Sequence, residues 1–516
     1  MKDTKIIRVR YAPSPTGSQH CGGLRTALFN YLFAKKHGGK FILRIEDTDQ
    51  KRFVPGAEDY IMRSLYWLGI EPDEHPLNPG NCGPYRQSAR KELGIYKEYV
   101  QQLLDAGYAY YAFDTESDLN LMRKRQELMK SKEGYNCNTR KVMMNSLTLP
   151  ASEVTRKLEA KDPYVIRLKV PEKEEIRFHD LILGWIMVES KDIDDKVLMK
   201  SDGMPAYHLA NVVDDHLMGI THVIRGQEWA PSAPFHILLY KYLGWSDSMP
   251  EFAHLPLLMG PNGKLSKRDG NTLGFPIFPL SYTYTNPDTG IEESVTGFKD
   301  VGYNPDTLFN FLALMGWSPG DTKEIMCREE IIEKFSLEKV NKSGCLFDPV
   351  KLKHFQNIYF KAQDKEELYE RFFITLNKSL IDRDIEPALS NKARKVFEMA
   401  YERSSFEREL LENIDFFFIK PVMIQDTVNL VPEEIVAVIL EFPNIIDSED
   451  NGFQIKDKLF ALIKTKGLKN GQVLKPLRYI VTGEEHGPEL HNIFDTLSKE
   501  DLKERILDAF KSVVGN

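Results

Sequence analysis

Cysteine is scarce in this chain of 516 residues, which has only five, far apart from one another: Cys21, Cys82, Cys137, Cys327 and Cys345. Such spacing makes neither a disulfide framework nor a Cys-x-x-Cys pair, and it suits a reducing compartment. Long hydrophobic runs are also missing, so no stretch reaches the length that a membrane-spanning helix needs. The first residues run directly into a strand-like segment without the apolar core of a signal peptide. We therefore expect a cytoplasmic protein without a membrane partner.

The sequence also lacks an excess of positive charge. Its formal net charge is −8 at pH 7, which on its face argues against a nucleic-acid partner. Binding RNA requires only a local basic surface, however, and the stretch between Lys458 and Glu484 contains no acidic residue. Its basic residues are Lys464, Lys466, Lys469, Lys475 and Arg478. A solvated surface explains any one of them equally well, so charge leaves an RNA partner open.

The chain opens with the pattern of a β-α-β unit. Residues 6–11 are typical of a strand, residues 24–36 of a helix ended by Gly38-Gly39, and residues 40–45 of a second strand. Parallel strands place ligands at their carboxyl ends, where Arg10, Ser14 and Glu46 fall.

A chain of this length should form several domains. From about residue 113 to 195 the composition is charged and less periodic, with a helical stretch at 116–132 and a strand-like one at 164–168. We interpret it as an insertion between two halves of a nucleotide-binding domain, which resumes with strand-like residues 196–200. Beyond about residue 376 the pattern is mostly helical. The predicted division is 1–112, 113–195, 196–257, 258–375 and 376–516.

Two short segments indicate the chemistry. The first, Pro13-Ser14-Pro15-Thr16-Gly17-Ser18-Gln19-His20-Cys21-Gly22-Gly23, is a Gly-rich turn before a helix. There, unpaired backbone N–H groups and the helix dipole favour phosphate. The second, Lys264-Leu265-Ser266-Lys267-Arg268, places two lysines around a serine. Each alone is as typical of an ordinary surface turn, but together they describe a device that holds the triphosphate of ATP.

These segments resemble the two signatures of class I aminoacyl-tRNA synthetases, and their surroundings are similar to bacterial-type glutamyl-tRNA synthetases. The segments that carry this likeness are Ala12-Pro13-Ser14-Pro15-Thr16-Gly17, Arg25-Thr26-Ala27-Leu28-Phe29-Asn30 and Arg44-Ile45-Glu46-Asp47-Thr48-Asp49. The resemblance runs, with gaps, from about Arg8 to the C-terminus. It implies an α/β fold: a Rossmann-like catalytic domain in two halves, with residues 113–195 as an inserted tRNA acceptor-binding domain. Residues 258–375 would contact the tRNA stem, and residues 376–516 would form an all-α anticodon-binding region.

The resemblance implies a glutamate pocket. Its residues would be Arg10, Ala12, Ser14, Glu46, Tyr207, Asn211 and Arg225. Tyr207 and Asn211 lie one helical turn apart, so both can face one pocket, although Tyr207 could equally belong to the core. Two arginines suit a dianionic amino acid because guanidinium groups bind carboxylates in bidentate geometry. The alternative for Arg225 is a surface ion pair. Glu46 would face the substrate ammonium.

The resemblance also implies an ATP site. Its residues would be Ser14, Thr16, Gly17, His20, Gly22, Gly23, Glu228, Trp229, Lys264, Ser266 and Lys267. The glutamate α-carboxylate would attack the α-phosphorus of ATP, and the tRNA ribose hydroxyl would then attack the glutamyl-adenylate. Such a reaction needs alignment and charge neutralisation rather than a protein nucleophile. We expect His20, Lys264 and Lys267 to be the catalytic residues, together with one Mg²⁺.

Three departures from the family pattern stand out. Cys21 replaces the usual isoleucine; its thiol could be reactive at a helix N-terminus, but a buried spectator is favoured. Some relatives bind zinc through a Cys-x-Cys in the insert, where this chain has Ala112-Phe113-Asp114 and retains only Cys137, so we expect no zinc and no other bound metal site. Residues 271–301 form an extra segment whose alternation and Asn286-Pro287-Asp288-Thr289-Gly290 turn predict a hairpin. A surface decoration is favoured over a role in closing the ATP loop.

The sequence therefore predicts a monomeric enzyme that ligates L-glutamate to tRNA-Glu and releases AMP and pyrophosphate. One alternative is glutamylation of queuosine in tRNA, by enzymes that are short and lack an anticodon region. Another is a catalytically inactive tRNA-binding relative, against which the intact His20, Lys264 and Lys267 count. Three questions stay open: whether tRNA-Gln is also charged, which residues read the anticodon, and whether activation requires bound tRNA.

Overall fold

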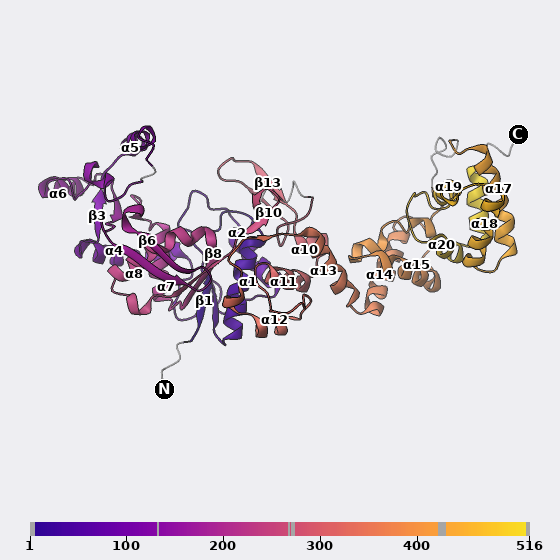
Figure 1. Cartoon of the computed structure of the whole chain (residues 1–516), viewed down its shortest axis with the longest axis horizontal. Coiled ribbons are helices and arrows are strands. Elements are labelled where there is room, and N and C mark those ends of the chain that lie inside the picture. The colour runs from indigo at the N-terminus through magenta and orange to yellow at the C-terminus, as the bar shows by residue number, and fades with distance from the viewer. Residues whose placement is uncertain (1–5, 132–133, 267–268, 270–273, 422–429, 512–516) are drawn as a thin grey trace. The chain divides into compact units, whose positions relative to one another are not determined.

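The computed structural model of the chain describes residues 6–131, 134–266, 269, 274–421 and 430–511 (Figure 1). Lys267, which the sequence predicts to be catalytic, lies outside the described residues. The chain forms two compact units, residues 1–352 and 353–516. No helix in the described ranges is long and apolar enough to cross a membrane.

A six-stranded sheet in the order β2-β1-β8-β9-β5-β6 forms the centre of the first unit. Its strands are β1 (Arg8–Tyr11), β2 (Lys40–Leu43), β5 (Glu175–Asp180), β6 (Gly184–Glu189), β8 (His222–Gly226) and β9 (Glu251–Leu255). All neighbours are parallel except β5 and β6. The two strands predicted at the start of the chain are confirmed. Their inner residues, such as Val9 and Ile42, are fully buried, as expected of parallel strands covered on both faces.

Helix α1 (Cys21–Lys36) packs against β1, β2 and β8 (Figure 1). It begins three residues before the predicted start at Leu24, because His20 caps it. The Gly22 N–H donates to His20 Nδ1 at 2.9 Å. Histidine is not a usual N-cap and the following glycines disfavour helix, so sequence patterns place the start too late. The predicted end is confirmed: Gly38 takes a left-handed φ of 61° directly after the cap.

The first unit contains further helices. They are α2 (Ala57–Leu68), α3 (Gln87–Glu92), α4 (Ile95–Asp105), α5 (Glu116–Leu128), α6 (Ala151–Glu159), α7 (Tyr207–Leu217), α8 (Ala233–Tyr242), α10 (Phe298–Val301), α11 (Pro305–Leu314), α12 (Arg328–Lys334) and α13 (Pro349–Lys361), the last crossing into the second unit. Smaller sheets contain β10 (Leu258–Gly260), β11 (Gly263–Lys264) and β14 (Cys345–Leu346), and the hairpin of β12 (Tyr282–Thr285) and β13 (Glu292–Val295). The predicted hairpin within residues 271–301 is therefore confirmed.

The strands of the predicted insert also pair with strands outside its limits. Its β4 (Val165–Leu168) lies between β3 (Ala109–Ala112) and β7 (Val197–Met199), which both fall outside residues 113–195. The β5–β6 hairpin, which falls inside those limits, joins the main sheet through β9. Alternate residues of β5 are buried, so its period-two pattern marks a strand. The pattern does not reveal the partner strand, and this is why the predicted boundaries differ from the strand pairing.

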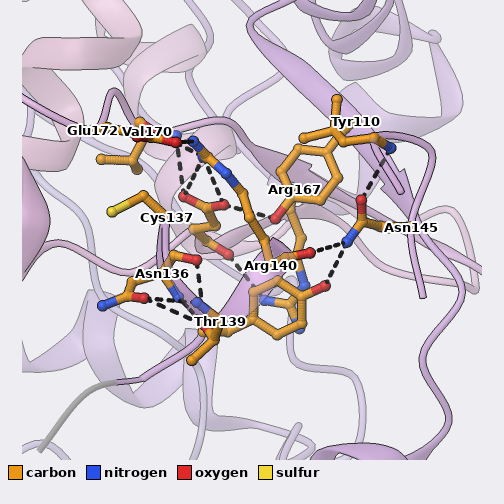
Figure 2. A network of polar contacts seen from close by, with 12 residues as sticks. Tyr110, Asn136, Cys137, Thr139, Arg140, Asn145, Arg167, Val170 and Glu172 are labelled. Carbon is orange, nitrogen blue, oxygen red and sulfur yellow. Dashed lines mark hydrogen bonds and ion pairs between the residues drawn. The ribbon is translucent and has the colours of Figure 1, made fainter. Parts of the chain in front are cut away.

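A polar network is buried between the strands of the insert (Figure 2). The fully buried carboxylate of Asp195 accepts hydrogen bonds from Tyr110 Oη at 2.7 Å, Arg140 Nη1 at 3.1 Å and the Val170 N–H at 3.1 Å. Figure 2 shows Asn145 beside Arg140, and its amide donates to the Arg140 carbonyl at 2.7 Å. Asp195 thus balances a buried arginine and joins β3 to the segments around β4.

Asp195→Ala should destabilise the insert by about 3–5 kcal/mol, because it leaves a buried guanidinium and a buried hydroxyl without their acceptor. Hydrogen exchange of the β3 and β4 amides measures this opening locally. Asp194→Ala is the matched control: Asp194 forms a partly exposed ion pair with Lys196 and should contribute at most about 1 kcal/mol. Equal protection in the two variants would contradict a stabilising role for Asp195.

The second unit is all-α in its described part, as predicted. Its helices are α14 (Lys365–Ile381), α15 (Ser390–Arg403), α17 (Glu433–Ser448), α18 (Gly452–Thr465), α19 (Asn470–Thr482), α20 (Leu490–Thr496) and α21 (Lys499–Ala509). The predicted boundary at 375/376 falls inside α14, whose buried stripe of Leu368, Phe372 and Leu376 shares one core with α15. The lysines predicted as a basic surface, Lys464, Lys466, Lys469 and Lys475, are exposed, whereas Arg478 is half-buried.

Candidate active site

A cavity of about 370 Å³ lies at the carboxyl ends of β1, β2, β8 and β9. This is a usual size for a small-molecule site. It brings together Arg10, Ala12, Ser14, Thr16, Gly17, His20, Gly22, Gly23, Glu46, Tyr207, Asn211, Arg225, Glu228, Trp229 and Lys264. Of the predicted site residues that are described, only Ser266 is outside this lining, next to Leu265, which belongs to it.

The glycines of the first signature are required by their neighbours. A Cβ at Gly22 would lie 2.6 Å from His20 Cε1, and one at Gly23 would lie 2.8 Å from Tyr11 Oη. Gly17 has a φ of 117°, which side-chain-bearing residues rarely adopt. Sequence analysis placed Gly22 and Gly23 in an ATP site because they belong to a Gly-rich turn before a helix. The structure adds that the turn itself has no room for side chains there.

His20 and Cys21 meet at the N-terminus of α1. Because His20 Nδ1 accepts the Gly22 N–H, the neutral ring carries its proton on Nε2, which makes that atom a donor. The Cys21 side chain is fully buried, and burial raises the pKa of its thiol to about 12. The alternative of a reactive thiol is therefore wrong, since a thiol in this environment stays protonated.

Lys264 lies in the same cavity on β11. Its Nζ is 3.1 Å from Glu228 Oε1, and both side chains are exposed to solvent. An exposed pair of this kind is weak, so a phosphate group can replace the carboxylate as a partner of Lys264. Beyond it, the Ser266 Oγ–H donates to Asp269 Oδ2 at 2.8 Å. The second signature thus presents a cation to the cavity that the first signature lines.

Arg225 is buried, with 5% of its surface exposed. Its Nε donates to His254 Nε2 at 3.0 Å, Nη1 to Tyr207 Oη at 3.1 Å and Nη2 to the Trp229 carbonyl at 3.3 Å. Across the described part of the chain it has no ion pair with a carboxylate, and burial lowers the pKa of the guanidinium. The surface ion pair considered for Arg225 is therefore wrong.

The free donors of Arg225 define what it can bind. A guanidinium has five N–H groups, and these three bonds leave one on each Nη. Two such Nη–H groups can hold a carboxylate with two parallel bonds. A buried cation without a carboxylate partner is costly, and an anionic ligand removes that cost.

Arg10 also lines the cavity, but part of its guanidinium group is already paired. Its Nε and Nη2 donate to the two oxygens of Asp215 at 2.9 and 3.2 Å, and Asp215 also accepts from Arg44 Nη1 at 2.7 Å. The side-on edge of Arg10 is thus already occupied. Sequence analysis missed Asp215, although Val212-Val213-Asp214-Asp215 places two acidic residues in an apolar helix. Buried acids need partners, and that was the available signal.

Glu46 lines the same cavity and is hydrogen-bonded to Arg44. Its Oε1 accepts from Arg44 Nη2 at 3.0 Å and from Asn211 Nδ2 at 2.9 Å. Burial raises the pKa of this carboxyl, while Arg44 opposes the shift. Asn211 and Tyr207 both face the cavity from α7, one turn apart as predicted. Tyr207 is thus a pocket residue, and its ring also packs 4.6 Å from that of Trp229.

Two further residues hold Arg225 and carry no motif that sequence analysis could have used. His254 donates from Nδ1 to Asp180 Oδ2 at 2.6 Å, so its Nε2 is free to accept the Arg225 N–H. Burial lowers the pKa of His254, which keeps the ring neutral. Burial acts to raise the pKa of Asp180, but hydrogen bonds from His254 and the Leu183 N–H outweigh it and hold that pKa below its usual value.

Comparison with known proteins identifies the class. The family described as "tRNA synthetases class I (E and Q), catalytic domain" matches residues 6–276 and 290–354, and the family described as "Anticodon binding domain" matches residues 367–510. The chain therefore belongs to the class I tRNA synthetases for E and Q, which are ATP-using enzymes.

Individual relatives narrow this further. The glutamate–tRNA ligase of Cytophaga hutchinsonii is 47% identical over 98% of both chains, and that of Amoebophilus asiaticus is 46% identical over 99% of both. A crystal structure of a glutamate tRNA ligase from Elizabethkingia meningosepticum, in complex with its amino acid, is 43% identical. It covers 98% of this chain and 99% of its own, with a TM-score of 0.83. Within its class, this chain belongs to the glutamate–tRNA ligases.

His254→Leu should raise KM for glutamate by about 5- to 150-fold, the cost of about 1–3 kcal/mol for leaving the Arg225 Nε–H buried without an acceptor. His254→Gln is the matched control, since its amide oxygen can still accept that bond and should recover most of the affinity. Steady-state aminoacylation at varied glutamate measures both variants. A folded His254→Leu enzyme with an unchanged KM would contradict the orienting role of His254.

Proposed function

We propose that this cavity activates L-glutamate with ATP and transfers the glutamyl group to tRNA-Glu. The observation that carries the proposal is Arg225: a buried cation without an ion-pair partner in the described chain, in the same cavity as the His20-capped turn. The first feature suits a carboxylate and the second suits phosphate. A single cavity that suits both is what a reaction between a carboxylate and a triphosphate requires.

Glutamate would bind at the Arg225 end of the cavity. The remaining Nη–H groups of Arg225 would hold the γ-carboxylate, with the Tyr207 ring beside it. Glu46 would face the ammonium, since Oε1 is used by Arg44 and Asn211 while Oε2 has no hydrogen bond among the described contacts. The remaining Nη donors of Arg10 and the turn at Ala12 and Ser14 would contact the substrate backbone atoms.

ATP would bind along the first signature. Thr16, Gly17, Gly22 and Gly23 would let the phosphates approach the backbone closely, and Glu228 and Trp229 line the same cavity. His20 Nε2–H and Lys264 Nζ would neutralise charge on the phosphates, and Ser266 and Lys267 would complete the second signature. Mg²⁺ bound with the triphosphate would shield its charge, with Glu228 as the carboxylate nearest to Lys264.

The chemistry follows from these positions. An oxygen of the glutamate α-carboxylate attacks the α-phosphorus, the bond from that phosphorus to the bridging oxygen breaks, and pyrophosphate leaves with the electron pair. The terminal ribose hydroxyl of the tRNA then attacks the carbonyl carbon, loses its proton, and AMP leaves. Alignment of the reactants and neutralisation of phosphate charge supply the catalysis.

The rest of the chain supports tRNA-Glu as the acceptor. A family of anticodon-binding domains matches most of the second unit, and relatives of the same length align throughout. Glutamylation of queuosine is therefore not favoured. We further propose a monomeric, cytoplasmic enzyme without zinc. In support, Asp114, at the place of the missing cysteine pair, already accepts hydrogen bonds from Tyr135 Oη at 2.8 Å and the Met144 N–H at 2.7 Å.

Arg225→Gln should lower kcat/KM for glutamate by a factor that corresponds to at least about 2 kcal/mol of lost transition-state stabilisation, because a charge-assisted bidentate pair is lost. Glutamine should be a very poor substrate of the wild-type enzyme, and the variant should narrow the gap between the two amino acids. Aminoacylation of tRNA-Glu with each amino acid measures this. Arg63→Gln, which alters an exposed arginine paired with Asp59, is the control. Full preference for glutamate in Arg225→Gln would show that Arg225 is structural.

His20→Ala should slow glutamyl-adenylate formation by about 10- to 1000-fold, because a donor to the phosphates is lost. It also removes the N-cap of α1, so His20→Asn is the informative partner: asparagine keeps a capping oxygen but has no donor at the Nε2 position. Rapid-quench measurement with tRNA-Glu present compares the two. If only His20→Ala were slow, His20 would act as a helix cap rather than on ATP.

A further inference from the structure

The β12–β13 hairpin lies where this chain departs from its family. Residues 277–289 fall in the gap between the two matched segments of the catalytic family. The hairpin is regular, with Tyr282 opposite Val295 and Tyr284 opposite Glu293. Sequence analysis favoured a surface decoration. The contacts of its inward face favour a role beside the cavity instead.

Tyr284 packs directly on the ATP-binding turn. Its side chain is mostly buried, and a Cβ at Gly17 would lie 3.0 Å from Tyr284 Cε2. The hydroxyl of Tyr284 donates to Glu293 Oε2 at 2.5 Å, and Asn286 Nδ2 donates to Glu293 Oε1 at 2.6 Å. The hairpin therefore fixes the Tyr284 side chain through Glu293, and the edge of the ring lies against the backbone of Gly17.

The segment leading into the hairpin holds the other end of the same turn. The Cys21 N–H, at the start of α1, donates to the Ile277 carbonyl at 2.7 Å. One of the N–H groups that a helix leaves unpaired at its N-terminus is thus satisfied by residue 277 rather than by a ligand. The two contacts lie on either side of His20 in the sequence.

The hairpin itself is anchored on α2 and the loop before it. Tyr282 stacks on Tyr60, with ring centroids 4.6 Å apart, and its hydroxyl donates to the Pro55 carbonyl at 2.9 Å. In return, Tyr60 Oη donates to the Leu280 carbonyl at 3.1 Å. Val54 and Ala57 complete a small apolar cluster with Tyr284. These contacts make the hairpin a fixed support rather than a loose extension.

We propose that the β12–β13 hairpin is a positioning element for ATP, with Tyr284 as its positioning residue. It holds residues 17–21 in the conformation that phosphate binding requires, before ATP arrives. Preorganised donors bind phosphate without the cost of ordering a Gly-rich turn, and this turn contains Gly17, Gly22 and Gly23. The inference rests on the proposed role of this turn in binding ATP.

Three variants test the proposal by aminoacylation at saturating tRNA-Glu. Tyr284→Ala removes the ring from Gly17 and should raise KM for ATP at least about tenfold, with KM for glutamate changing less than about twofold. Tyr284→Phe keeps the ring against Gly17 but loses the hydrogen bond to Glu293, so it should raise KM for ATP by a smaller factor than Tyr284→Ala. Ile291→Ala, at the exposed tip of the hairpin, is the control for a neutral change. Thermal unfolding of each variant reports whether it is folded.

The outcomes separate the two proposals. An unchanged KM for ATP in folded Tyr284→Ala, or equal losses for all three substrates, would overturn the positioning role. If Tyr284→Ala did not fold, Glu293→Ala would replace it, since it frees the hydroxyl of Tyr284 and should shift KM for ATP in the same direction by a smaller factor. If His20→Asn also left ATP use unchanged, the assignment of the turn itself would fail. If ATP use were impaired in His20→Asn but not in Tyr284→Ala, only the hairpin proposal would be rejected.

Discussion

The buried carboxylate of Asp215 is the interaction on which the site depends. It holds Arg10 from β1 and Arg44 from the segment after β2, and so joins both strands to α7 directly beneath the cavity. Without it, two arginines would repel each other in a region of low dielectric. Because Asp215 balances Arg10, the positive charge that remains for a ligand is concentrated on Arg225. The same pairing that stabilises the sheet thereby determines where an anion can bind.

Local patterns in the sequence predicted a large part of this structure. The first β-α-β unit, the β12–β13 hairpin and the all-α second unit follow from hydrophobic period, glycine placement and turn residues, which act over a few residues. The predicted site residues that are described, except Ser266, also line one cavity, because strands that run parallel bring their following loops to the same edge. What each of them does in the reaction stays a prediction.

Pairing between distant segments could not be predicted. Asp215 is 205 residues from Arg10, and His254 is 29 residues from Arg225, so no spacing rule connects either pair. The same reason explains why the predicted boundaries do not follow the strand pairing. Nothing in the local pattern of β5 indicates that it pairs with β9. The start of α1 was predicted too late for a different reason: a histidine cap with two glycines in the first turn runs against average helix preferences. Tertiary structure overrode local preference there.

The position of β5 has a consequence for how the chain can be rearranged. β5 adds to the main sheet, and its last residue, Asp180, holds the histidine that orients Arg225. Residues 113–195 are therefore not a cassette that can be removed or exchanged between relatives as one piece. A swap that preserves the catalytic body has to leave residues 175–189 behind and join the foreign segment before β5. The segment that can be exchanged as one piece is therefore shorter than the predicted insert.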